Sequence, residues 1–140
     1  MFESRIKKIR AITSKLDKAV LRSLKNHEKE VTDYITKIQL FEKGEDGQGL
    51  TLGDYTPFTI ELKKSKGQKT SNITLKDTGD FYKSYKLGIN GLITADAQKD
   101  DTNLVTEFGA DILVLSDKGQ DVMIKLFVLE DTQNFIRSEL

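Results

Sequence analysis

The chain has 140 residues and no net charge at pH 7, because 22 basic side chains balance 22 acidic ones. This length suits one domain, residues 1–140, that buries its own core. The lack of cysteine excludes disulfides, thiolate metal sites and cysteine chemistry. No run of about 18 apolar residues occurs, so we expect no membrane span. The charged first ten residues also differ from a signal peptide.

The charges are unevenly distributed along the chain. Residues 1–30 hold nine Lys or Arg and four Asp or Glu, whereas residues 87–140 hold four basic and ten acidic side chains. The simplest interpretation is that these charges solvate helix faces. A second is head-to-tail association between copies, in which opposite patches steer docking. A third is nucleic-acid binding by the basic segment, although it lacks the interleaved aromatic residues that stack on bases.

Residues 1–42 are predicted to form a basic helical region. Apolar residues recur there at spacings of three and four, which is typical of a helix with a narrow apolar stripe. We expect Asn26 and His27 to interrupt this helix before a second periodic segment over residues 31–41. The stripe either packs on the core of its own domain or contacts another subunit. Its members are Phe2, Ile6, Ile9, Ile12, Leu16, Val20 and Leu24.

Residues 43–140 are predicted to form an α+β core. The glycine-rich residues 43–56 indicate a loop or a short hairpin. Thr56 and Pro57 suit the N-cap and the first position of a helix that continues to about Lys64. A polar loop is expected after this helix.

The strand signals begin near Ile73. Asn90-Gly91 separates two apolar runs and predicts a hairpin with a type I′ turn, which requires positive φ at both turn residues. Farther along, we expect a polar loop over residues 96–102, a helical turn over 103–108 and a short strand over 111–115.

The last helix is predicted to begin after an N-cap at Ser116 and to run to the C-terminus. Its apolar stripe is broad, because Met123, Phe127 and Phe135 widen it, and a broad stripe favours burial against a sheet. The predicted fold class is therefore α+β. It has a long N-terminal helical segment, a small antiparallel sheet with the Asn-Gly hairpin, and a C-terminal helix packed on that sheet.

The segment 73–85 contains the triplet Asp77-Thr78-Gly79, which also occurs in aspartic proteases. Those enzymes need two such carboxylates, and this chain has one triplet. We therefore interpret the segment as a structural corner, in which Asp77 and Thr78 bond to the backbone of a turn and Phe81 faces the core. The corner residues are Asp77, Thr78, Gly79, Phe81 and Ser84.

No catalytic, cofactor or metal site is predicted, and we expect no enzymatic activity. His27 is the only histidine, and we expect it to be solvated rather than to be a ligand. Residues 42–53 lack the alternating ligands and the final Glu of a calcium loop. Their glycines do not match a phosphate-binding loop.

The order of several short motifs resembles that of a known group of proteins. Gln39-Leu40-Phe41 precedes Asp46-Gly47-Gln48-Gly49 and Gly53-Asp54-Tyr55-Thr56-Pro57. The stretches Leu75 to Ser84, Asn103 to Gly109 and Ile112 to Asp117 follow before the last helix. In this order, residues 39–140 resemble a family of small structural proteins of tailed bacteriophages, seen in phages and prophages of gut bacteria.

More remotely, the chain is similar to head–tail joining and tail-completion proteins of the lambdoid type. Their Thr-Gly-x-Leu-x-x-Ser-like element matches Gly79, Phe81 and Ser84 of this sequence. The resemblance implies an α+β domain that assembles into a ring at the neck or tail of a virion, without a cofactor. Its partners would be further copies and other virion proteins such as portal, connector or tail proteins. The chain would be made in the cytoplasm of the bacterial host and end in the virion.

The leading functional hypothesis is thus a virion structural protein that acts by ring assembly and adhesion. The alternative is a nucleic-acid-associated packaging or regulatory protein that uses the basic N-terminal helix. A core position is favoured over an interface for the two tyrosines among the interface candidates. Those candidates are Ile6, Ile9, Leu16, Val20, Tyr82 and Tyr85.

Overall fold

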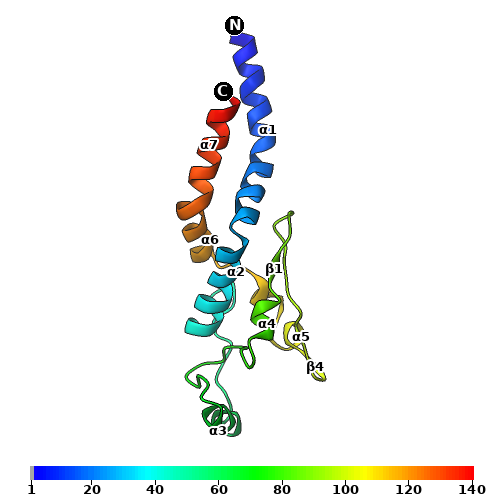
Figure 1. Ribbon diagram of the computed structural model, residues 1–140, viewed down its shortest axis with the longest axis vertical. Coiled ribbons are helices and arrows are strands. Elements are labelled where there is room, and N and C mark those ends of the chain that lie inside the picture. The colour runs from blue at the N-terminus through cyan, green and yellow to red at the C-terminus, as the bar shows by residue number, and fades with distance from the viewer. Residues whose placement is uncertain (1) are drawn as a thin grey trace.

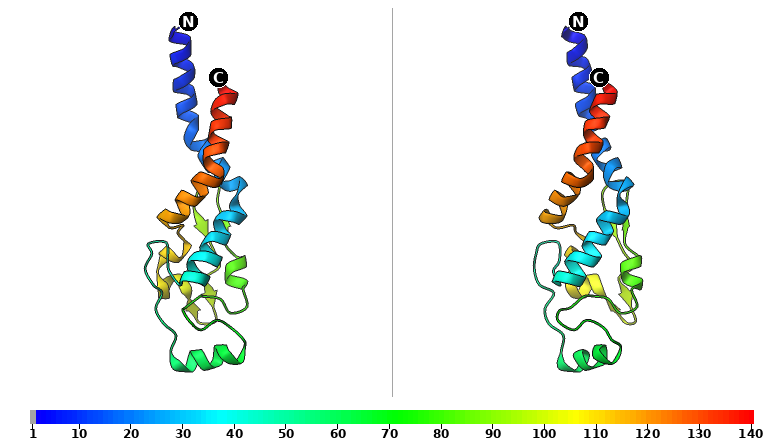
Figure 2. Two further views of the ribbon diagram at one scale, coloured as in Figure 1. Left: turned by 90° about the vertical axis from the view of Figure 1, so that its left-hand side faces the viewer. Right: turned by 60° about the vertical axis from the view of Figure 1, so that its left-hand side comes forward.

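The computed structural model describes residues 2–140, which form an elongated and mostly helical molecule (Figure 1). Two long helices lie side by side at one end, two short hairpins lie on one flank, and α3 lies at the far end (Figures 1 and 2). The helices are α1 (Phe2–Asn26), α2 (Glu28–Asp33), the π-helical η1 (Tyr34–Lys43), α3 (Pro57–Ser65), α4 (Asp80–Lys83), α5 (Leu104–Phe108), the 3-10 helix η2 (Ala110–Leu113), α6 (Asp117–Met123), the π-helical η3 (Ile124–Val128) and α7 (Leu129–Glu139). The strands are β1 (Lys86–Leu87), β2 (Ile93–Thr94), β3 (Gln98–Lys99) and β4 (Thr102–Asn103).

The C-terminal helix packs on α1, not on a sheet as the sequence led us to expect. Both chain ends lie at the same end of the molecule, so α1 and α7 run in opposite directions (Figure 1). Ile12, Ala19 and Ser23 of α1 are buried. Each strand is only two residues long, so neither sheet offers a face that could cover a helix. We call this antiparallel pair of α1 and α7 the arm.

The predicted interruption at Asn26 and His27 is confirmed, and it is built around the histidine. His27 stacks on Phe127 with ring centroids 4.0 Å apart, and its Nε2 lies 3.4 Å from a carboxylate oxygen of Asp131. The expectation of a solvated His27 is met only in part, because the side chain is 27% exposed while its ring packs on Phe127 of η3 at the bend between α1 and α2.

The hairpin at Asn90-Gly91 is present, with Lys86 opposite Thr94 and Leu87 opposite Ile93. Its turn is not type I′, since Gly91 alone has positive φ, at 83°, and its N–H bonds to the carbonyl of Gly88 at 3.0 Å. The loop thus has three residues and ends in a left-handed glycine.

The expected loop over residues 96–102 is instead a second hairpin. Strands β3 and β4 pair across Asp100-Asp101, where Asp100 has φ 51°. Asp tolerates the left-handed region better than most residues, because its short side chain bonds locally. The chain therefore has two separate two-stranded sheets within residues 2–140 rather than one.

Two apolar clusters form the core. The larger one is built around Ile35, Leu40, Tyr85 and Ile112, and the smaller one joins Val31, Leu87 and Met123. The larger cluster joins η1 to the corner and η2, and the smaller one ties α2 and β1 to α6.

Three predicted helix starts are confirmed. Thr56, Asn103 and Ser116 each accept a hydrogen bond from a backbone N–H in the first turn that follows. The strand predicted over residues 111–115 was wrong, because residues 110–113 form η2 and bond locally. No helix within residues 2–140 is both long enough and apolar enough to cross a membrane.

Candidate functional site

An apolar groove lies where the arm joins the rest of the molecule. Its volume is about 530 Å³. Helices α1 and α2 form one wall, the β1–β2 hairpin a second, and η2 with the α6–η3 helix a third. Among the described residues that line it, only Gln120 has a polar side chain, and its amide already donates to the Leu115 carbonyl at 3.0 Å.

The floor and the rim of this groove differ in exposure. Val31, Leu87 and Met123 are buried in the floor, where they form the smaller core cluster. Leu92 and Ile124 are exposed on the rim. A groove whose walls contain only one polar side chain is suited to bind apolar side chains.

The arm carries a second unusual surface, on the side of α1 that faces α7. Along most of the arm this seam is covered: Ser23 Oγ donates to Asp131 at 2.6 Å, and Lys15 Nζ lies 3.4 Å from Glu139. Helix α1 continues beyond the end of α7, as Figures 1 and 2 show. The seam continues there without cover, and its last three apolar side chains are Phe2, Ile6 and Ile9, which are 80%, 38% and 56% exposed. We call these three residues the tip seam.

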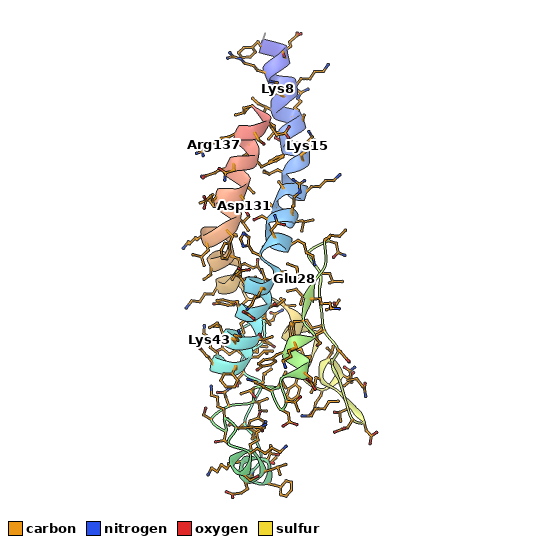
Figure 3. All side chains as sticks on the ribbon, viewed as in Figure 1. Lys8, Lys15, Glu28, Lys43, Asp131 and Arg137 are labelled. Atoms are coloured by element: carbon orange, nitrogen blue, oxygen red, sulfur yellow. The ribbon has the colours of Figure 1, made fainter. Side chains whose placement is uncertain are left out.

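Both helices of the arm carry charged side chains. Figure 3 places Lys8 and Lys15 on α1, and Asp131 and Arg137 on α7. Residues 2–11 hold four basic side chains and one Glu, and all of them are exposed. Residues 107–121, which include part of the groove wall, hold four acidic side chains and one Lys. A basic tip and an acidic region thus coexist in one chain.

The six interface candidates are divided by the structure between three locations. Ile6 and Ile9 belong to the exposed tip seam, and Leu16 and Val20 are half-buried farther along α1, where Val20 lines the groove. Tyr82 and Tyr85 lie within or against the larger core cluster.

The two tyrosine hydroxyls bond to backbone carbonyls. Tyr85 donates to Ile112 at 2.6 Å, and Tyr82 donates to Thr74. Burial raises the pKa of both hydroxyls above the usual range. Both tyrosines therefore act in the core of this chain.

The corner residues surround the start of α4. Thr78 Oγ1 accepts from the N–H of Asp80 at 3.3 Å, and Gly79 has φ 93°, a conformation that favours glycine. Phe81 packs against the larger cluster and meets Tyr85 edge to face at 5.2 Å. Ser84 Oγ accepts from the N–H of Asp96 at 2.9 Å and so holds the start of the β3–β4 hairpin.

Asp77 bonds to side chains rather than to the backbone N–H groups we expected. Its Oδ1 accepts from Gln68 Nε2 at 3.0 Å and from Lys66 Nζ at 3.3 Å, and Lys99 Nζ lies 3.5 Å from Oδ2. The Gln68 bond, helped by the charges of Lys99 and Lys66, lowers the pKa of Asp77 to about 2. The carboxylate thus ties the loop after α3 to the β3–β4 hairpin.

Two side chains that bond to the backbone of distant segments were not predicted from the sequence. We call these two sets of bonds the Gln39 clamp and the Glu28 clamp. Gln39 is buried; its Nε2 donates to the Val114 carbonyl at 3.0 Å and its Oε1 accepts from the Ser116 N–H at 2.9 Å. Glu28 accepts from the Leu87 N–H at 2.6 Å. A Gln on the apolar side of a periodic segment was a signal for the first clamp, but no pattern in the sequence marks the second.

No group of three His, Asp or Glu side chains in residues 2–140 is placed to hold a metal ion. The Asp46 carboxylate in the glycine-rich loop accepts from the N–H groups of Gln48 and Leu50, at 2.9 and 3.0 Å. It shapes its own turn.

Comparison with protein-family models, with curated proteins and with solved structures finds no match for this chain. The groove and the tip seam are therefore interpreted from their own chemistry.

Proposed function

We propose that this chain is a structural protein of a tailed-phage virion, of the head–tail connector, neck or tail-completion type. It acts without catalysis, by assembling into a ring and adhering to neighbouring virion proteins. The observation that carries this proposal is the uncovered tip seam of α1, where three large apolar side chains continue a seam that α7 covers farther along. Exposed apolar side chains that continue a packed surface are typical of protein–protein contacts.

The opposite end of the molecule supports the same interpretation. Helix α3 lies at the end away from both termini (Figure 1). Phe58 and Leu62, one helical turn apart on α3, are 78% and 47% exposed. An elongated chain with apolar side chains exposed at both ends is suited to contact one neighbour at each end, as a connector component must.

The virion assignment also rests on the sequence resemblance over residues 39–140. Its test is the composition of purified particles. Particles from a density gradient should contain this protein in a fixed ratio to the major capsid protein, as measured by immunoblot. Purified protein added to particles that lack it controls for non-specific adherence. A particle fraction free of the protein overturns the proposal.

A second candidate function is nucleic-acid binding by α1. The observation in its favour is that Arg5, Lys7, Lys8 and Arg10 are all exposed on one short stretch of helix. Neutralising phosphates with such side chains gives binding that falls steeply with salt. If this function holds, fluorescence anisotropy detects duplex binding at low salt, and replacing Lys7, Lys8 and Arg10 with Gln abolishes it. The absence of binding by the unaltered protein at low salt eliminates this candidate.

A further inference from the structure

We propose that the tip seam of one copy docks into the apolar groove of a neighbouring copy. This inference deepens the proposed function and rests on it, because it identifies the two surfaces that would join adjacent subunits of the assembly. The occupant of the groove is thus a second copy of this chain, and the interface is heterologous, with the tip of one subunit in the groove of the next.

The tip seam and the groove are both apolar. Phe2, Ile6 and Ile9 stand at positions i, i+4 and i+7, which is the spacing by which an amphipathic helix places its anchors in a groove. The groove offers about 530 Å³ of space between walls of aliphatic side chains. The tip seam and the rim of the groove are exposed, so docking removes apolar surface of both copies from water.

The charges match in sign. With about 100° per residue, Arg5 and Arg10 lie about 70° to either side of the tip seam. On the continuous α6–η3 helix, Gln120 and Ile124 line the groove, and Asp117 and Asp121 lie within about 80° of their mean direction. Lys118 lies about 140° away. Basic flanks of the tip therefore meet acidic residues beside the groove.

The tip cannot reach the groove of its own chain. Helix α1 is continuous from Phe2 to Asn26. Since Val20 lines the groove, the first residue of the helix lies about 27 Å away along the helix axis. Figures 1 and 2 place the tip at the end of the arm, and the groove-lining α2 and β1 lie at its base. A heterologous contact of this kind closes into a ring when its rotation allows closure.

Pairing of two tip seams with each other is the competing arrangement. It would bring Arg5 and Arg10 beside one seam close to Arg5 and Arg10 of the other copy. Like charges in one interface oppose association, so the groove, with Asp117 and Asp121 beside it, is the better partner. The two arrangements predict different neighbours for Ile9.

Because the chain has no cysteine, engineered thiols report these neighbours directly. Copies with Ile9→Cys are mixed with copies carrying Ile124→Cys and oxidised mildly. Leu62→Cys serves as the matched control, because Leu62 and Ile124 are equally exposed at 47% and Leu62 lies on α3, away from the groove. We expect the 9–124 disulfide dimer in at least fivefold excess over both the 9–62 dimer and the 9–9 dimer.

Charge exchange provides a second readout. Arg5→Glu combined with Arg10→Glu should lower the 9–124 yield several-fold, and Asp121→Arg in the acceptor copy should restore part of it. A dominant 9–9 dimer, or equal yields at positions 62 and 124, overturns the docking inference. If particles contain the protein but the 9–124 dimer does not form, the docking is wrong while the virion function stands.

Discussion

The carboxylate of Glu28 accepts a hydrogen bond from the backbone N–H of Leu87 at 2.6 Å, and this bond joins the first residue of α2 to strand β1. Lys25 completes the arrangement, because its Nζ lies 3.1 Å from the same carboxylate and donates to the Leu87 carbonyl at 2.6 Å. Both polar backbone groups of Leu87 are thus bonded at the base of the groove, next to the bend at His27.

We expect Glu28→Ala to lower the free energy of unfolding by about 1 kcal/mol, since a partly exposed charged hydrogen bond is lost. The Leu87 N–H, then the Lys25 bond, lowers the pKa of Glu28. The stabilisation is therefore present above the usual Glu pKa and is lost as pH falls through the folded-state value. Urea denaturation at pH 7 and pH 3 measures it, with Glu61→Ala on α3, where the side chain is exposed, as control. Equal losses at both pH values would show that the charge is irrelevant.

The Gln39 clamp predicts a larger effect. Gln39→Ala removes a buried side chain and leaves the partly buried Val114 carbonyl and Ser116 N–H without their side-chain partner, so we expect a loss of about 2 kcal/mol. Gln39→Glu should also destabilise the fold, because a carboxylate oxygen would face the Val114 carbonyl. Thermal unfolding by circular dichroism measures both. The exposed Gln133→Ala is the matched control, and a Gln39→Ala protein as stable as this control would refute the role of the clamp.

We expect Asp77 to make a pH-dependent contribution to the free energy of unfolding. We expect Asp77→Ala to cost about 1 kcal/mol at pH 7 through the bonds to Gln68 and Lys66. Because the folded-state pKa is about 2, below the usual Asp value of 3.8, this stabilisation is present above about pH 4. It is lost as the pH falls toward 2.

Denaturant titrations of Asp77→Ala and of the unaltered protein, at pH 7, 4 and 2, measure this window. The difference in unfolding free energy should be largest at pH 7 and smallest at pH 2. The exposed Asp54→Ala should show no such trend. A difference that grows with acidity would contradict the direction of the pKa shift.

We expect replacement of Tyr85 to change the stability of the fold and not its self-association. Tyr85→Phe removes the hydroxyl that donates to the Ile112 carbonyl in the larger core cluster, and we expect a loss of about 1–2 kcal/mol. Tyr34→Phe is the comparison, because the Tyr34 hydroxyl has no hydrogen-bond partner within residues 2–140. Chemical denaturation should separate the two variants, and self-association measured by light scattering should not. If Tyr85→Phe weakened association without loss of stability, Tyr85 would belong to an interface.

Local signals were predictable from the sequence where a short-range rule determines the structure. Thr56 and Ser116 formed the expected caps, and Gly91 closed a hairpin, because these depend on a few neighbouring residues. The strand predicted over residues 111–115 was wrong because strand formation depends on a neighbouring strand as well as on the local sequence. Their β-branched run suits a strand, but no strand lies beside it, and the chain bonds to itself as η2.

Tertiary partners were not predictable in this way. The broad stripe of the last helix favoured a sheet as its partner, yet two-residue strands provide no such surface, and Leu126 and Leu129 remain exposed. The groove is likewise built from residues that are far apart in the sequence, such as Val20, Leu92 and Ile124. A periodic pattern identifies an apolar face but not what covers it.

The proposed structural role at the head–tail junction of a virion can be tested by locating the protein on purified particles. Antibody against this chain, visualised with gold on intact purified particles, should mark the junction between head and tail. Label at that junction in most particles is the predicted result. Particles without label, while the same antibody detects the free protein in the host lysate, would show that the protein is not a component of the virion.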